Sequence, residues 1–334
     1  MIQSPSSEGS RSAESWPDLP YRKWRDTYAT LHMWTQIVGK IRVGQASWIN
    51  HSWHATLFVT ARGLTTLPVP YGDRTFQLDF DFLDHRLLIQ TSDARTKTMP
   101  LGPRSVADFY QELFAHLFEL GLDIKIHTTP NEVGEAIPFE QDRVHASYDA
   151  EYANRFWRAL VQADRVFKQF RGGFVGKCSP VHFFWGSFDL AVTRFSGRRA
   201  PVHPGGVPNC PDWVTREAYS HELSSCGFWP GSEAMPEPVF YAYAYPEPPG
   251  FSAAQVRPDQ AGYDSVFREY ILPYDSVRQA PAPDATLLSF LQDSYAAAAN
   301  LGEWDRAAIE CTAFPFPLAP ASSSQPASAA WAER

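Results

Sequence analysis

The sequence predicts an α+β fold, with one or more mostly antiparallel sheets, long amphipathic helices packed on one face, and possibly two similar α/β halves. Two observations carry this prediction. Residues 74–82 (RTFQLDFDF) alternate apolar and polar side chains, as a strand with one buried face does. Residues 149–171 instead repeat apolar side chains at helical spacing and are followed by a Gly-Gly pair.

The sequence of the first half of the chain indicates a helix that is followed by several strands. Helical spacing of Trp24, Tyr28 and Leu31 indicates a helix over 24–40. The segment HATLFVTARGL (54–64) is rich in β-branched and aromatic residues and is expected to form one strand. Strand 74–82 then turns at LDH into RLLIQTSD, which predicts a hairpin with one dry and one wet face.

A second helix is expected after this hairpin. Ser105 precedes an apolar stripe and has Asp108 three residues later, which is an N-cap pattern, and Gly121 marks the end of the helix. The segment DIKIHT, at 123–128, is expected to add a short strand.

The second half predicts the same kinds of element in another arrangement. After helix 149–171, a hairpin is expected from 181–185 and 188–195, and YAYAY within 239–248 is the most regular strand pattern in the chain. A last helix is expected over 284–300. The intervening segment 198–238 is rich in Pro and Gly and is expected to be an ordered loop, because it also carries Trp, Phe and His.

Composition sets the expected domain organisation. Residues 1–15 and 317–334 are rich in small polar residues and are expected to be disordered. Residues 16–316 are expected to form a single large unit, with possible halves at 16–145 and 146–316.

Charge and composition also limit the expected partners. A net charge of −8 disfavours a nucleic-acid partner. The absence of a long apolar run or an apolar leader predicts no membrane partner and a cytoplasmic protein, in which Cys178, Cys210, Cys226 and Cys311 are expected to be reduced. We expect a small-molecule ligand or substrate, and no oligomeric state is predicted.

Four blocks of the sequence resemble a bacterial family of unknown function, the one numbered 5996. They are NHSWHATLFVTARGLTT, PVHFFWGSFDLAVTRFSGR, EAYSHELSSCGFWPG and FYAYAYPEP. The resemblance extends from about Trp16 to Trp304 and implies that the chain is one family unit. It brings no activity and no catalytic residue with it.

Several histidines are candidate metal ligands. Three neutral imidazoles and a carboxylate can hold Zn²⁺ or Fe²⁺ and leave a position open for catalysis. Isolated histidines are also common in cores and turns, and the chain has no H-E-x-x-H motif. The hypothesis needs the hairpin and the following loop to fold over each other, and its ligands are His182, His203, His221 and Glu217, with His51 and His54 as alternates.

The functional prediction is a metal-dependent enzyme, of hydrolase or oxygenase type, that acts on a small, partly apolar metabolite in an aromatic-lined pocket. Glu222 and Asp189 are the candidate catalytic residues. The candidate ligand-contacting residues are Trp185, Phe184, Tyr243, Arg194 and Arg198.

Two alternatives stay open at this point. One is a non-catalytic binding protein with Trp and Tyr pocket walls, in which Arg194 and Arg198 bind an acidic group of the ligand. The other is a protein-interaction module that uses the tyrosine face of 239–245. A serine triad and a phosphate-binding loop are disfavoured, because WGSFD lacks G-x-S-x-G and RGGFVGKCS lacks the required spacing.

Overall fold

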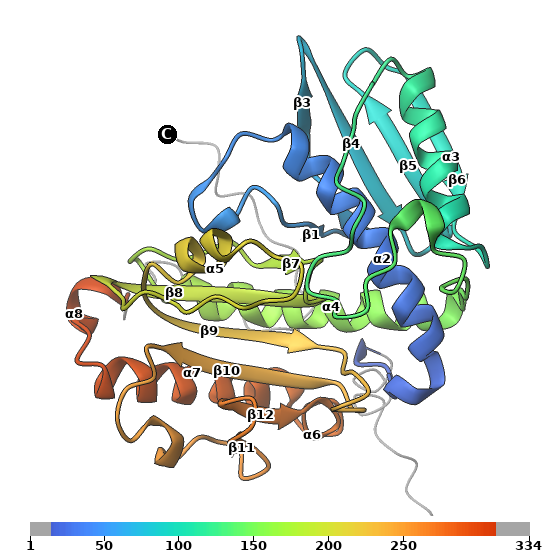
Figure 1. The fold of residues 1–334 in the computed structure, drawn as a ribbon. Coiled ribbons are helices and arrows are strands. Elements are labelled where there is room, and N and C mark those ends of the chain that lie inside the picture. Colours follow the sequence, from blue (N-terminus) through green and yellow to red (C-terminus); the bar gives the residue numbers. More distant parts are fainter. Residues whose placement is uncertain (1–14, 312–334) are drawn as a thin grey trace, which may run out of the picture.

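Two six-stranded sheets organise the described part of the chain (Figure 1). The computed structural model of the protein describes residues 15–311, and the two predicted tails lie outside the described residues except for Ser15. Every strand pair in both sheets is antiparallel. The predicted α+β class, with mostly antiparallel sheets, is confirmed.

The first sheet has the order β1-β2-β4-β5-β6, with β3 paired to β4. In β4, Phe76, Leu78 and Phe80 are buried, as the alternation predicted. The strands are β1 Phe58–Val59, β2 Gly63–Thr65, β3 Val69–Tyr71, β4 Arg74–Asp81, β5 Arg86–Thr91 and β6 Thr96–Pro100.

Two strand predictions in this half were wrong. Segment 54–64 is not one strand, because the Thr60 hydroxyl accepts hydrogen bonds from the N–H groups of Arg62 and Gly63 and turns the chain between β1 and β2. Segment 123–128 forms no strand; Ile124 is buried, but its backbone joins no ladder.

The second sheet has the order β11-β12-β10-β9-β8-β7. Its central strand β9, His221–Trp229, lies inside segment 198–238, which the sequence predicted to be a loop. That prediction was wrong because the run LSSCGF shows no clean alternation of apolar and polar residues. Helix α5, Asp212–Ala218, ends before β9 begins, so Glu217 and His221 share no helix face. The strands are β7 His182–Phe184, β8 Asp189–Arg199, β9 His221–Trp229, β10 Val239–Tyr245, β11 Gly262–Asp264 and β12 Glu269–Pro273.

The long helices form where apolar spacing and capping residues predicted them. Ser105 caps α3 by accepting from the Asp108 N–H, and Asp149 caps α4 by accepting from the Tyr152 N–H. The remaining helical segments are α2 Tyr21–Gln45, α3 Val106–Glu119, α4 Ala150–Gly172, α6 Tyr274–Arg278, α7 Pro283–Leu301 and α8 Arg306–Ile309, with short 3₁₀ turns η1 Asn50–Ser52, η2 Phe139–Gln141 and η3 Phe251–Ala253.

Helices α4 and α7 cover one face of the second sheet (Figure 1). On that face the Phe240 ring packs against Phe167 and Tyr274. The opposite face of β10 carries Tyr241 and Tyr243, which both keep part of their surface exposed. Coverage by long helices on one side therefore leaves a polar, aromatic face on the other side.

Helix α2 joins the two sheets. Its Gly39 packs so closely on Trp185 that an added Cβ would lie 2.2 Å from the indole ring. Leu57, just before β1, pairs with Phe183 of β7. Buried side chains from both sheets accordingly form one continuous hydrophobic cluster.

The contact between Gly39 and Trp185 predicts an unusual substitution effect. Alanine normally favours a helix over glycine by about 1 kcal/mol. Gly39→Ala should nevertheless lower the free energy of unfolding by about 1–3 kcal/mol, because the methyl group overlaps the indole. Denaturant unfolding measures this change.

Gly44→Ala, in the last turn of the same helix, is the matched control. A Cβ there would make only an ordinary contact, 3.8 Å from the Lys125 carbonyl oxygen. It should be neutral or stabilising, and equal effects of the two substitutions would contradict the packing described.

Candidate functional site

Carboxylates and tyrosines gather on the face of the second sheet that lies opposite α4 and α7. The register places Gly227 of β9 between Ala191 of β8 and Tyr241 of β10, and Ser225 between Thr193 and Tyr243. Because side chains alternate along a strand, the neighbouring residues Asp189 and Glu269 point to this same face. We call the set Glu132, Asp189, Tyr219, Tyr241, Tyr243 and Glu269 the acid–tyrosine face.

Asp189 lies at the centre of the acid–tyrosine face and is 6% exposed. Ser187 donates a hydrogen bond to its Oδ1 and the Tyr241 hydroxyl donates to its Oδ2. The tyrosine reaches Asp189 across β9, where its hydroxyl lies 2.3 Å from the position that a Cβ of Gly227 would occupy. Glycine at 227 is therefore what lets this hydrogen bond form.

Glu132 reaches the same region from the loop between α3 and η2. It adopts a left-handed backbone with φ of 61°, and its N–H donates to the Pro208 carbonyl. The residue as a whole is exposed, but its carboxylate is turned onto buried Gly186, with Oε1 2.1 Å from where a Cβ would lie. The acidic end is thus the shielded part of this side chain.

The surroundings raise the pKa values of these acids. Burial, with the nearby Asp189 charge, raises the pKa of Glu132 and that of Glu269 to about 7. Burial also raises the pKa of Asp189, against the opposing hydrogen bonds from Ser187 and Tyr241. Among residues 15–311, none of the three carboxylates forms an ion pair with Lys, Arg or His.

The tyrosines act as neutral hydrogen-bonding groups. The Tyr219 and Tyr243 hydroxyl oxygens are 2.8 Å apart, and the Tyr241 and Tyr243 rings stack at 6.1 Å. Burial raises the pKa of Tyr219 to about 12 and raises that of Tyr241 as well. Each hydroxyl group therefore keeps its proton near neutral pH, and each ring is partly exposed.

Of the six predicted metal ligands, His203 lies beside this face. Its ring packs at 4.6 Å from Tyr219 and 5.2 Å from Tyr245, and its Nδ1 accepts from the Gly205 N–H. It is therefore an aromatic neighbour of the tyrosines.

The fold does bring His51, Glu217 and His221 together. The His51 and His221 rings are 6.1 Å apart, and the His51 N–H donates to Glu217 Oε2 at 2.6 Å. Both ring nitrogens of His51 already have partners: Nδ1 contacts the carbonyls of Glu217 and Ala218, and Nε2 contacts Lys177. Burial, then the Lys177 charge, lowers the pKa of His51 to about 4.

His182 and His54 lie elsewhere in the core. His182 is fully buried, contacts the Thr56 hydroxyl through Nδ1 at 3.1 Å, and lies among the rings of Trp53, Phe58 and Phe184. Burial lowers its pKa to about 3. The His54 ring accepts a hydrogen bond from the Ile49 N–H.

Within residues 15–311, no group of three His, Cys, Asp or Glu residues is placed to hold a metal ion.

The two predicted arginine anchors already have structural roles. Arg194 is 1% exposed and lies on the helix-covered face of β8, with its guanidinium carbon 3.5 Å from the Phe170 ring centre and 4.3 Å from that of Tyr295. It cannot meet the same ligand as Tyr243, because the two residues point to opposite faces. Arg198 forms an ion pair with Glu222 at 2.7 Å. Glu222, a candidate catalytic residue, therefore has its negative charge balanced within the protein.

The aromatic residues Trp185 and Phe184, predicted to contact a ligand, instead pack against other residues of the protein. Trp185 packs on Gly39 and donates its Nε1–H to the Ala55 carbonyl at 2.7 Å. Phe184 contacts the His182 ring. Of the predicted residues, Asp189 and Tyr243 are the ones that belong to the acid–tyrosine face, with His203 next to it.

Sequence reasoning missed Glu132, Glu269, Tyr219 and Tyr241 as site residues. Tyr241 was within reach, because the alternation in β10 places it on the same face as Tyr243. Glu132 gave no signal, because it comes from a loop far away in the sequence.

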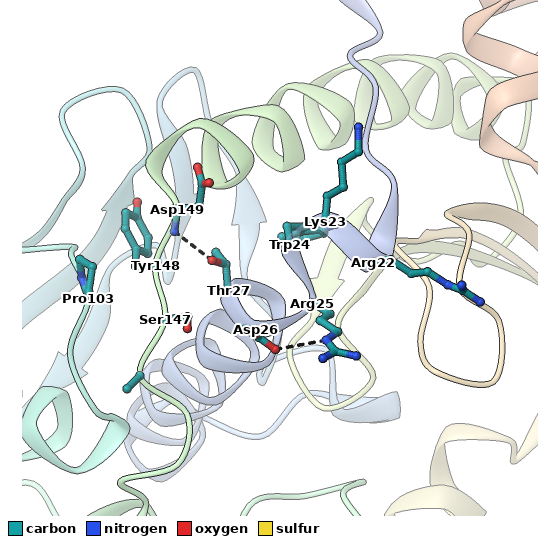
Figure 2. A pocket seen from close by; sticks show the side chains of 11 residues that line it. Arg22, Lys23, Trp24, Arg25, Asp26, Thr27, Pro103, Ser147, Tyr148 and Asp149 are labelled. Atoms are coloured by element: carbon teal, nitrogen blue, oxygen red, sulfur yellow. Dashed lines mark hydrogen bonds and ion pairs between the residues drawn. The ribbon is translucent and has the colours of Figure 1, made fainter.

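Two surface hollows lie apart from the acid–tyrosine face. The larger, of about 350 Å³, lies at the start of α2, and none of the predicted site residues lines it. Figure 2 shows its basic side chains Arg22 and Lys23 pointing in different directions, while the Thr27 hydroxyl accepts from the Asp149 N–H. The smaller, of about 210 Å³, lies beside the end of α7 and includes Glu222 and Tyr245.

Fold and site together define an α+β protein in which the face of the second sheet opposite α4 and α7 is lined by acids and tyrosines. The chain belongs to a family of unknown function (DUF5996), whose model matches residues 16–311. No curated protein and no solved structure matches the chain. No helix among the described residues is long and apolar enough to cross a membrane.

The raised pKa values predict a pH effect on stability. The folded-state pKa of about 7 for Glu132 and Glu269 lies above the ordinary value of 4.5. The folded state therefore binds more protons between these values, and the stability that the two groups contribute is full below about pH 4.5 and is lost as the pH rises through about 7. The double variant Glu132→Gln, Glu269→Gln should lose less stability than the unmodified protein between pH 5 and pH 8, measured by denaturant unfolding.

Glu135→Gln is the matched control, because Glu135 is exposed on the same loop as Glu132. Its pH profile should follow that of the unmodified protein. Parallel profiles for the double variant would show that the two carboxylates are fully hydrated.

Proposed function

We propose that the protein binds a small organic cation, such as a protonated amine with an apolar body, on the acid–tyrosine face. The observation that carries this proposal is the set of three acids, Glu132, Asp189 and Glu269, with no cationic partner among the described residues. Carboxylates partly removed from water gain most from a partner that brings the opposite charge.

The aromatic side chains favour an organic cation over a hydrated metal ion. Tyrosine rings attract cations through their faces, and Tyr219, Tyr241 and Tyr243 are partly exposed beside the acids. An ammonium group also has several N–H donors for the carboxylates, while its apolar body covers the rings. The proposed ligand class is therefore a small amine, and it differs from the acidic ligand of the arginine-anchored alternative that the sequence left open.

The proposal predicts selective binding of amines. Tryptamine should bind, whereas the corresponding neutral alcohol (tryptophol) and acid (indole-3-acetate) should bind at least about tenfold more weakly, since each tenfold step corresponds to ~1.4 kcal/mol. Isothermal titration calorimetry on the full chain measures this. Amine affinity should also rise from pH 5.5 to pH 8, because Glu132 and Glu269 lose protons near pH 7.

Asp189→Asn keeps the shape of the central side chain and removes its charge. It should weaken tryptamine binding by about tenfold, whereas Glu135→Gln should leave the affinity unchanged. Equal affinities for the amine, the alcohol and the acid would overturn the proposal.

The metal-dependent activity predicted from the sequence stays a prediction. Elemental analysis of protein made without a histidine tag tests it separately. About one metal ion per chain, lost in His51→Asn together with His221→Ala, would support it without altering the amine proposal.

A further inference from the structure

A buried arginine and a buried histidine lie together where the two sheets meet. Leu57, just before β1, and Phe183 of β7 exchange backbone hydrogen bonds there, and both side chains are fully buried. Because side chains alternate along a strand, the residues on either side of this pair share the opposite face. Those residues are Thr56, Phe58, His182 and Phe184.

Arg42 of α2 is the cation beside this face. Its guanidinium carbon lies 5.3 Å from the centre of the Phe58 ring, and its Nε–H donates to the His54 carbonyl at 2.6 Å. The residue is 9% exposed, and its Nη1 is buried with no hydrogen-bond partner in the described part of the chain. Burial is the one influence on the pKa of Arg42 and lowers it only to about 10, so the guanidinium stays charged near neutral pH without an acid beside it.

His182 supplies a second nitrogen atom without a partner. It is fully buried, its Nδ1 lies 3.1 Å from the Thr56 hydroxyl, and its Nε2 has no hydrogen-bond partner among residues 15–311. The imidazole centre lies 6.3 Å from that of Phe58, the ring that Arg42 also contacts. The two unpartnered groups therefore border the same aromatic ring, and Arg42 acts electrostatically on His182.

Partly exposed aromatic rings lie next to these buried groups. The ring centres of Trp53 and Phe184 are 6.4 Å and 4.6 Å from that of His182, and both residues, like Phe58, keep part of their surface exposed. Buried polar groups nearly always have a hydrogen-bond partner, and a buried charge without an opposite charge is costly. A ligand with an anionic group and a flat apolar body would supply the partners and cover the rings.

We propose that Arg42 and His182 anchor a small planar carboxylate. The guanidinium group is suited to the two oxygen atoms of a carboxylate, which accept its N–H groups. The Thr56 hydroxyl can donate to Nδ1 of His182, which leaves the ring proton on Nε2 as a further donor. The apolar body of the ligand packs on the three partly exposed rings. This ligand is separate from the amine proposed for the acid–tyrosine face and has the opposite charge.

Benzoate is the probe that tests this proposal. Isothermal titration calorimetry on the full chain should show that benzoate binds at least about tenfold more tightly than benzyl alcohol, which keeps the ring but lacks the charge. An excess of tryptamine should leave the benzoate affinity unchanged, because the two ligands are assigned to different side chains.

A substitution of the arginine tests its role. Arg42→Gln keeps a polar side chain and removes the charge, so it should weaken benzoate binding by about tenfold or more. Arg22→Gln is the matched control, because Arg22 is an exposed arginine of the same helix. It should leave the benzoate affinity unchanged.

A crystal structure of the unmodified chain with 4-bromobenzoate needs no variant to fold. Anomalous scattering should place the bromine beside Trp53 and Phe58, with the carboxylate toward Arg42. Equal affinities for benzoate and benzyl alcohol would overturn the proposal, as would an unchanged affinity in folded Arg42→Gln or a bromine signal confined to other parts of the protein.

Discussion

The hydrogen bond from Tyr241 to Asp189 is the interaction on which the candidate site depends. It spans three strands, because Tyr241 of β10 reaches over Gly227 of β9 to the first residue of β8. It holds a buried carboxylate by hydrogen bonding alone, without a cation. The same charge disfavours ionisation of Glu132 and Glu269, so the three acids form one electrostatic unit.

The arrangement of the helices explains why this unit can exist. Helices α4 and α7 occupy one face of the second sheet, where Arg194 is enclosed by aromatic rings and serves the core. The other face receives side chains from loops, including Glu132 and Tyr219. The face packed against α4 and α7 therefore supplies rigidity, and the face lined by loops carries the candidate site, as is usual for sheets that carry sites.

The sequence predicted elements whose signal is local. Helix α4 and strands β4 and β10 follow directly from side-chain periodicity and capping, and the shared face of Tyr241 and Tyr243 was implicit in the same pattern. Strand β9 escaped prediction because a central strand buried on both faces, with Ser and Gly in its middle, shows no alternation. That Arg194 and Tyr243 point to opposite faces of the sheet could be derived only once the register of β8, β9 and β10 was known.

The site itself depended on contacts that are distant in the sequence. Glu132 meets Gly186, and His51 meets Lys177, through tertiary folding that leaves no periodic trace. Histidine count suggested metal binding, yet the folded chain distributes these imidazoles among backbone carbonyls, hydroxyls and aromatic rings. The residues that emerge instead are acids and tyrosines from five separate segments.

The most direct test of the central claim is a carbon-detected NMR titration of the Asp and Glu side-chain carboxyl groups, in the free protein and with tryptamine bound. The account predicts that Glu132 and Glu269 titrate near pH 7 in the free protein and at lower pH once the amine is bound. Titration of both groups near the ordinary value of 4.5, unaffected by the amine, would contradict it.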